Sequence, residues 1–305
     1  MMKRTRPTIV FQISFLLAAG YLSGCIVVPA PIESHYNRGV EQYDKGNYAK
    51  SIEHYKRALS RNPNDSFAKY NLAVVYQDQG KHDRALELYR EILKKEEHSN
   101  SRVNIAAIYS TQGKTGKAIE ELKTAARNNP DTAHPLSALG EYLVRENRLE
   151  EAGQAYRKAL RIDDRHALTH HRLGKLDIKR GRTESGLDRL RKAVELAPGQ
   201  TLFLETLGEE YARTGNPSEA IHSFERASVL EPDREYFFVR LGDLYKKNEQ
   251  YQKAIVRYWS ALSINDGNPH VHRNLAEIFE HLARTEKKKL GVIQQKGALA
   301  QTPPD

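Results

Sequence analysis

The chain repeats itself with a period of about 34 residues. A period of this length is typical of a solenoid of stacked helix pairs, in which each unit contacts only its neighbours. The sequence therefore predicts one elongated all-α array rather than several globular domains. One turn position recurs at intervals of 33 or 34 residues, at Gly46, Gly80, Gly113, Asn147, Gly181, Gly215 and Glu249.

The same residue types recur around this turn, which we number 15 within a repeat of 34. Alanine recurs at positions 20 and 27, and proline at position 32 ends the second helix in several repeats. Large residues stand at positions 11 and 24, as in Tyr76 with Tyr89 and Tyr211 with Phe224. Position 8 is always small, at Gly39, Ala73, Ala106, Gly140, Gly174, Gly208, Gly242 and Ala276.

This pattern resembles the tetratricopeptide repeat family over about residues 34–283. The resemblance implies antiparallel helix pairs that form a right-handed superhelix. It divides the chain into a signal peptide (1–24), a lipidated tether (25–34), an array of seven repeats plus one further first helix (35–284), and a capping helix extension with a disordered tail (285–305). The charged content of 29% fits such an array, because repeats spread their apolar residues thinly.

The recurring positions also predict local packing. Small residues at positions 8 and 20 allow close approach of the two helices, and a glycine or asparagine at position 15 suits a left-handed residue that closes the first helix. Repeat five departs from the pattern, since Asp177 replaces the bulky residue at position 11 and Gly186 replaces alanine at position 20. We therefore expect residues 167–190 to be the softest interior part of the array.

The N-terminus reads as an export signal. Lys3, Arg4 and Arg6 precede an apolar run over residues 9–21, which is short for a membrane-spanning helix and typical of a secretory signal peptide. The following Leu22-Ser23-Gly24-Cys25 resembles the bacterial lipobox, whose cysteine is acylated and becomes the first residue of the mature protein. An uncleaved anchor or a chance cysteine is the alternative. Cys25 is also the only cysteine, so an intrachain disulfide is excluded.

Lipidation would place the protein in the bacterial envelope. Ile26 follows the cysteine where aspartate would signal inner-membrane retention, so the resemblance favours the outer membrane with the array facing the periplasm. Pro29 and Pro31 stiffen a short tether, which keeps the first repeat near the bilayer. Loss of the signal peptide lowers the formal charge from +9 to +6, and export argues against nucleic acid as a partner.

No residue pattern predicts catalysis. The spacing of His166 and His170 could place two ligands on one helix face, but no carboxylate completes a metal-binding motif. Nucleophile-elbow, phosphate-loop and dinucleotide-binding motifs are missing from the sequence. We therefore expect neither an enzyme nor a metal or cofactor site.

The family resemblance places a binding groove along the first helix of each repeat. In the N-terminal repeats its stripe is apolar, which predicts a partner-binding groove; the alternative is that these side chains pack only against neighbouring repeats or the tether. The stripe becomes charged from repeat five onward, at His171, Lys175, Glu205, Glu209, Val239, Asp243, Arg273 and Glu277. The predicted groove residues are Tyr36, Val40, Tyr43, Phe67, Tyr70, Val74 and Val103.

Two functions fit these features. The first is a lipid-anchored scaffold that binds periplasmic or outer-membrane proteins, as similar lipoproteins do in the assembly of pilus secretins or the docking of cell-wall hydrolases. The alternative is a structural component of an exopolysaccharide export machine. Both functions make the partner a protein of the bacterial envelope.

Overall fold

The computed structural model describes the backbone of residues 34–299 and the side chains of residues 34–292. Within this part of the chain there are fifteen α-helices and no strand. The expected all-α repeat fold is therefore confirmed. The predicted signal peptide, Cys25 and the rest of the tether up to residue 33 lie outside the described residues, as does the end of the tail from residue 300.

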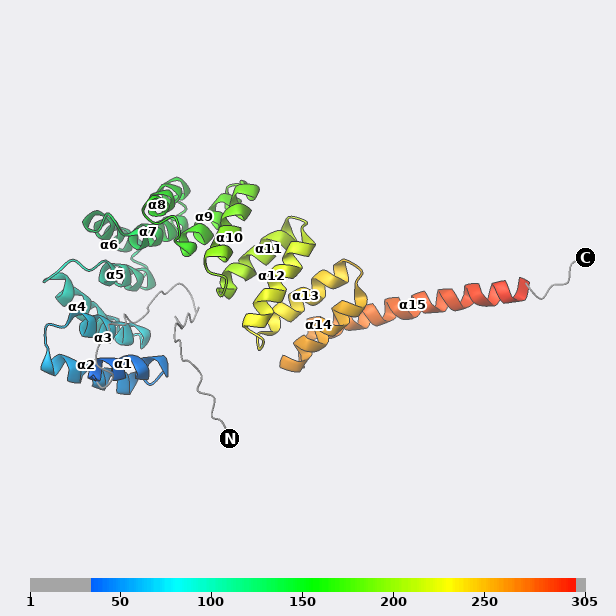
Figure 1. The fold of residues 1–305 in the computed structure, drawn as a ribbon, viewed down its shortest axis with the longest axis horizontal. Helices are drawn as coiled ribbons and strands as arrows, with labels where there is room; N and C mark the ends of the chain where they lie inside the picture. Colours follow the sequence, from blue (N-terminus) through cyan, green and yellow to red (C-terminus); the bar gives the residue numbers. More distant parts are fainter. Residues whose placement is uncertain (1–33, 300–305) are drawn as a thin grey trace, which may run out of the picture. The chain divides into compact units, whose positions relative to one another are not determined.

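The chain divides into two compact units, and the boundary falls between His166 and Ala167. In unit 1, helices pair as antiparallel hairpins, odd-numbered first helices with even-numbered second helices (Figure 1). Its helices are α1 (His35–Asp44), α2 (Tyr48–Arg61), α3 (Ser66–Asp78), α4 (His82–Leu93), α5 (Ser99–Thr111), α6 (Thr115–Asn128), α7 (Ala133–Arg145) and α8 (Leu149–Ile162).

Unit 2 continues the same order of hairpins and ends in a helix that has no second helix after it in the described chain. This last helix runs 31 residues, more than twice the length of the other first helices, so the expected helical extension continues to Leu299. The helices of unit 2 are α9 (Ala167–Lys179), α10 (Thr183–Leu196), α11 (Thr201–Arg213), α12 (Pro217–Leu230), α13 (Glu235–Lys247), α14 (Tyr251–Ile264) and α15 (Pro269–Leu299).

Every hairpin turns at the residue that the repeat predicted. All seven turn residues have a positive φ, from 57° at Asn147 to 81° at Gly215. Glycine adopts this left-handed conformation without steric cost, and five of the seven positions are glycine. The expectation that these residues close the first helix is confirmed. At Gly46, for example, the amide donates to the carbonyl of Tyr43 at 2.8 Å.

The small residue at position 8 lies under a ring from the second helix. A Cβ placed on Gly39 would lie 2.6 Å from Cε1 of Tyr55, and one on Gly242 would lie 2.4 Å from Cε1 of Tyr258. Both tyrosines are fully buried. Glycine therefore makes room for the aromatic residue at position 24, and this hairpin contact repeats along the core of each unit. The cost of glycine in a helix, about 1 kcal/mol against alanine, is offset by burial of the ring.

Candidate partner-binding site

The predicted groove residues lie on the first helices of three successive hairpins in unit 1. Tyr36, Val40 and Tyr43 belong to α1, Phe67, Tyr70 and Val74 to α3, and Val103 to α5. Their exposure differs greatly. Tyr70 is 3% exposed, Val74 is fully buried and Val103 is 7% exposed, whereas Phe67 is 42% exposed. Tyr36 is 7% exposed, and Val40 and Tyr43 are half-buried. The accessible apolar stripe is therefore narrower than the sequence predicted, and it centres on Phe67 at the start of α3.

Hydrogen bonds between successive repeats account for the burial of the tyrosines. Asn71 Nδ2 donates to Oη of Tyr36 at 2.9 Å, and Asn104 Nδ2 donates to Oη of Tyr70 at 3.1 Å. Asn104 also donates to Oη of Tyr89 at 2.9 Å. Both asparagines are buried, so each amide satisfies a tyrosine hydroxyl that would otherwise lose its hydration. For Tyr70, packing between repeats is the role that the structure supports.

The sequence carried a signal for this contact that the groove prediction missed. Asn71 and Asn104 stand 33 residues apart in the middle of predicted helices, where a buried amide needs a partner. Each follows a tyrosine by 34 or 35 residues, as Asn71 follows Tyr36. An asparagine in one repeat therefore donates a hydrogen bond to a tyrosine hydroxyl about one period earlier in the chain.

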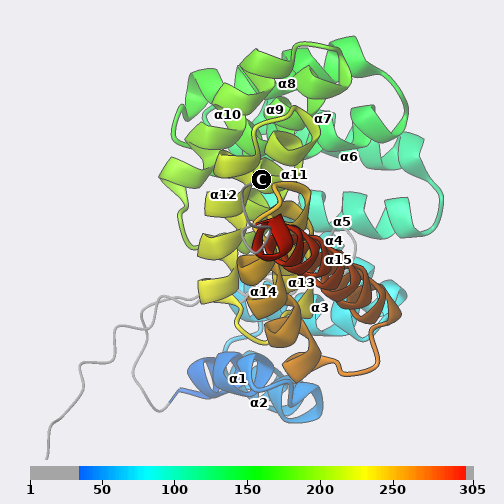
Figure 2. The ribbon, with the colours of Figure 1, turned by 90° about the vertical axis from the view of Figure 1, so that its right-hand side faces the viewer.

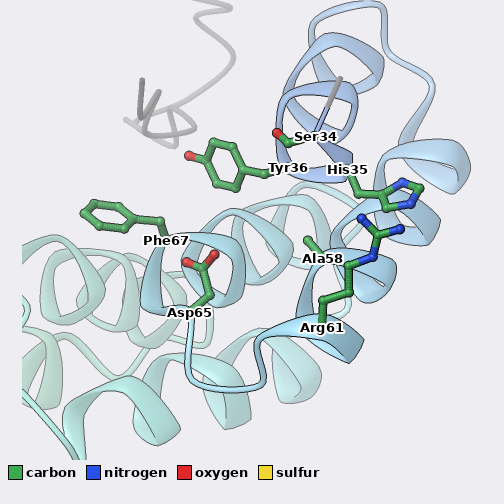
Figure 3. Close-up of a pocket in the computed structure, with 7 residues that line it drawn as sticks. All are labelled: Ser34, His35, Tyr36, Ala58, Arg61, Asp65 and Phe67. Carbon is green, nitrogen blue, oxygen red and sulfur yellow. The ribbon is translucent and has the colours of Figure 1, made fainter. Parts of the chain in front are cut away.

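A pocket of about 250 Å³ opens beside the exposed end of this stripe (Figure 3). Its floor and sides come from the first turns of α1 and α3 and the last turns of α2. In Figure 3 the rings of Tyr36 and Phe67 lie on one side of the pocket, and His35 lies near Arg61 on the other. The lining residues are Ser34, His35, Tyr36, Ala58, Arg61, Asp65 and Phe67.

Helix caps hold two of the polar residues in place. The Oγ of Ser34 accepts from the amide of Asn37 at 3.2 Å at the start of α1, and Asp65 Oδ1 accepts from the amide of Ala68 at 3.0 Å at the start of α3. Such caps satisfy amides that have no partner within the helix. Because both caps are defined by local sequence, the pocket is built on two fixed helix ends.

The charges around the pocket are mixed. Arg61 is exposed at the end of α2 and Asp65 is half-buried, so the lining offers one cation and one carboxylate next to two aromatic rings. His35 Nδ1 lies 3.3 Å from Nδ1 of His54. Loss of hydration, and then the positive charges of Arg61 and His54, lower the pKa of His35. A neutral His35 at pH 7 leaves Arg61 as the cation of this lining.

The charged stripe predicted for unit 2 consists largely of ion pairs between successive first helices. Arg240 Nη2 lies 2.6 Å from Oε2 of Glu209, and Arg234 Nη2 lies 2.8 Å from Oε2 of Glu205. Lys246 pairs in the same way with Glu277. These charges are engaged with each other across repeats, which favours a role in stabilising the array over one in binding a partner.

His171, which the sequence placed in this charged stripe, is buried and neutral. It is 4% exposed, its ring stacks on Phe203 with centroids 4.7 Å apart, and Nε2 lies 2.9 Å from Oγ1 of Thr206. Its Nδ1 is buried with no hydrogen-bond partner. Burial, with smaller effects of Lys175 and Arg172, lowers the pKa of His171 to about 3. The expectation of a charged surface residue is wrong here, because α11 covers the ring.

In repeat five an ion cluster occupies the place of the bulky residue at position 11. Asp177 is 3% exposed; its Oδ1 accepts from Nε of Arg182 at 3.1 Å, and its Oδ2 accepts from Nε of Arg189 at 2.9 Å. A Cβ on Gly186 would lie 2.7 Å from the carbonyl oxygen of Gly174, so the two glycines bring the backbones of α9 and α10 together. The place of the bulky residue at position 11 is therefore filled by this cluster, and the softness expected of residues 167–190 stays a prediction.

Two kinds of feature are absent from the described part of the chain. Across residues 34–292, His, Cys, Asp and Glu side chains form no group of three or more arranged to hold a metal ion. Among the helices that the structure describes, none combines the length and apolar character needed to cross a bilayer.

Comparisons with known proteins agree with the repeat. Family models described as tetratricopeptide repeat match residues 32–65, 54–87, 104–167 and 205–269. A curated relative, the Photosystem I assembly protein Ycf3 of Synechococcus sp. (strain CC9605), is 33% identical over 64 residues. That match covers 20% of this chain and 37% of the relative, so the chain spans little more than a third of it.

Solved structures share the fold. The match to the crystal structure of the APC/C hetero-tetramer Cut9-Hcn1 has a TM-score of 0.60 at 15% identity, and covers 79% of this chain and 48% of that one. The match to a tetratricopeptide repeat protein from Parabacteroides merdae ATCC 43184 has a TM-score of 0.52 at 19% identity, and covers 81% of this chain and 98% of that one. Such an array is a scaffold suited to protein–protein interaction. The repeat spacing, the left-handed turn residues and these matches show that the chain belongs to the tetratricopeptide repeat family.

Proposed function

We propose that this protein is a lipid-anchored tetratricopeptide adaptor of the bacterial envelope that holds a segment of a periplasmic or outer-membrane protein. The single observation that carries the proposal is the pocket at Tyr36 and Phe67, at the end of the array that follows the lipobox-like Cys25. An exposed aromatic side chain beside a cation and a carboxylate is the composition expected of an anchor point for a peptide.

The size of the pocket favours a peptide side chain over a cofactor. Pockets for small molecules usually enclose about 300–1,000 Å³ and bury most of the ligand. This one holds about 250 Å³, and Phe67 at its edge remains 42% exposed. One or two side chains of an extended or helical segment would fill it, and the rest of the segment would continue along the partly exposed Val40 and Tyr43 of α1.

The tether sets where such a segment would be captured. Ser34 comes nine positions after Cys25, and an extended chain spans at most about 3.5 Å per residue. A lipid on Cys25 would therefore keep the pocket within roughly 30 Å of the bilayer surface. A short periplasmic extension of an outer-membrane protein could reach it there. A role in exopolysaccharide export would use the same anchor and differs only in the identity of the bound protein.

Substitution of Cys25 tests the anchor. Cys25→Ser should release the protein from membranes and abolish labelling by a fatty-acid analogue, because the thiol is the proposed acylation site. The measurement is the distribution of the protein between membrane and soluble fractions, together with the label. Labelling that persists in the variant would show that the anchor lies elsewhere and would remove the envelope part of the proposal.

Substitution of Phe67 tests the pocket separately from the anchor. Phe67→Ala should weaken binding of the partner by about 2 kcal/mol, or roughly 30-fold, if Phe67 is a binding hot spot. A photo-reactive phenylalanine analogue at position 67 should first capture the partner in intact cells, so that its affinity can then be measured with purified proteins. Trp259→Ala is the matched control, since Trp259 is 55% exposed on α14 in unit 2. Equal binding by the two variants would refute the pocket assignment while leaving the lipid anchor intact.

A further inference from the structure

The last helix of the described chain presents a face that every earlier repeat covers. In the other first helices, position 8 is buried against the second helix of the same hairpin, as at Ala73 and Ala106. The equivalent residue of α15 is Ala276, which is exposed. Position 11 is buried or half-buried in the earlier first helices, 5% exposed at Tyr76 and 6% at Tyr245, but its equivalent in α15, Phe279, is 47% exposed.

Helix α15 does not turn back to cover this face within the described residues. Earlier first helices end after 10 to 13 residues, whereas α15 continues to Leu299 and runs on beyond α14, as Figures 1 and 2 show. Its packed face consists of Val271, Leu275 and Ile278, which are at most 4% exposed. Phe279 is about 40° from Leu275 and about 80–100° from Val271 and Ile278 around the helix, so it borders the packed face. Ala276 and Ala283 carry the exposed face further round.

The uncovered face continues as an apolar stripe along α15. Ala276, Ala283 and Leu290 recur every seven residues, and Phe279 follows Ala276 at the three-residue spacing of a helix-pairing seam. All four are exposed, Leu290 by 58%. Glu286 stands at the seam position between Ala283 and Leu290, so the apolar residues there are seven residues apart. Heptad spacing on an exposed helix is typical of a helix that pairs with another helix, and small alanines allow a close approach.

We propose that this stripe pairs with the same stripe of a second copy of the chain, antiparallel, so that α15 of each copy packs on the face that no second helix covers within the described residues of the other. A twofold axis makes such an interface self-complementary. Charge argues for the antiparallel direction. Glu280 and Lys287 flank the stripe on one side, seven residues apart. Antiparallel pairing sets Phe279 of one copy against Leu290 of the other, and Glu280 of each copy opposite Lys287 of the other.

The length of the stripe sets the affinity expected of the dimer. From Ala276 to Leu290 it covers about 21 Å of helix, which places the interface in the small, weakly bound class. We therefore expect a dimer that dissociates in the range of about 1 to 100 μM. Sedimentation equilibrium of the full chain in density-matched detergent measures it. A chain that remains monomeric up to the top of this range overturns the proposal, even if Phe279 proves to bind a different protein.

Charge reversal tests the direction of pairing. Glu280→Lys should weaken the dimer about tenfold, because each of two attractive contacts becomes repulsive. Adding Lys287→Glu to the same chain should restore the affinity, since the two exchanged charges would again face each other with opposite sign across the interface. Failure of the double variant to recover overturns the antiparallel register. Phe279→Glu should abolish the dimer, while Val292→Glu, 51% exposed on the opposite side of α15, should leave it intact.

Crosslinking gives a second measurement, which reports which residues of the two copies lie close together. Because Cys25 is the only cysteine, Cys25→Ser provides a background free of thiols. In that background Ala283→Cys should crosslink between two copies through a short bis-maleimide linker, because residue 283 lies near the proposed axis. Val292→Cys should not. Equal crosslinking from both positions, or more from residue 292, overturns the assignment of the face.

Discussion

At the scale of single residues, the turns between helices show that the left-handed conformation does not require glycine. Five of the seven turn residues are glycine, and the other two, Asn147 and Glu249, have φ of 57° and 58°. Asparagine tolerates this region better than most residues, whereas glutamate carries the full steric cost of its Cβ. The turn therefore forms at Glu249 because the helices on both sides of it pack, not because the residue favours it.

Replacing Glu249 by glycine should stabilise the protein. We expect Glu249→Gly to raise the free energy of unfolding by about 0.5–1 kcal/mol, since the left-handed strain of roughly 1–2 kcal/mol is partly offset by the greater freedom of glycine when unfolded. Urea unfolding measures the change. Asn248→Gly, at the neighbouring residue with φ of −90°, is the control and should be neutral or destabilising. A gain from Asn248→Gly as large as that from Glu249→Gly would contradict the argument.

The buried histidine predicts a dependence of stability on pH. The pKa of His171 falls from 6.5 to about 3 on folding, so the unfolded chain binds the proton more tightly. The stabilising effect of the neutral ring is complete above pH 6.5 and is lost by about 1.4 kcal/mol per pH unit as the pH falls from there toward 3. His171→Gln should flatten this slope in denaturant titrations between pH 7 and 5. His222→Gln, at an exposed histidine, should leave the slope unchanged.

At the scale of elements, repeat five replaces the usual aromatic wedge with charge. Its two glycines bring α9 and α10 together, and a buried Asp177 occupies the place of a tyrosine, held by Arg182, Arg189 and a Ser185 Oγ that lies 3.3 Å from Oδ2. The substitutions at positions 11 and 20 are therefore coupled. An aspartate is tolerated there because arginines on the second helix reach its carboxylate.

Removal of this carboxylate should destabilise unit 2. We expect Asp177→Ala to lower the free energy of unfolding by about 2–3 kcal/mol, below the range for a fully buried pair because Arg182 and Arg189 remain partly exposed. Thermal or urea unfolding measures the loss. Asp188→Ala removes an exposed carboxylate that pairs with Arg191 on α10 and should cost less than about 0.5 kcal/mol. Similar losses from the two variants would show that the cluster adds no stability.

At the scale of the whole molecule, stability is a sum of terms within repeats and between neighbours. Each unit has its own hydrophobic cluster, one spread over α1–α5 in unit 1 and one over α10–α15 in unit 2. The second half of α15 adds to neither cluster. Arg284 and residues 286–290 are exposed, and an isolated helix of this length is marginal in water.

Hydrogen exchange should follow this distribution of contacts. In dilute protein, amides of residues 286–299 should exchange fastest among the described residues, while those of residues 167–190 should be as protected as the adjacent repeats. Protection of residues 286–299 should rise with protein concentration if α15 pairs between copies. Fast exchange confined to residues 167–190 would confirm the soft repeat that the sequence alone predicted.

The sequence by itself determined the period, the helix pairs, the left-handed turns and the small-to-large contact within each hairpin. These features depend on residues that are close along the chain or repeated in register, so one chain displays them several times. Only the tertiary structure decided which predicted groove residues are accessible. Tyr36 and Tyr70 are held by asparagines 34 or 35 residues further along, and His171 is covered by α11. The burial of a groove residue depends on side chains from the adjacent repeat. The pattern of residues along one helix does not show which of its side chains the adjacent repeat will cover.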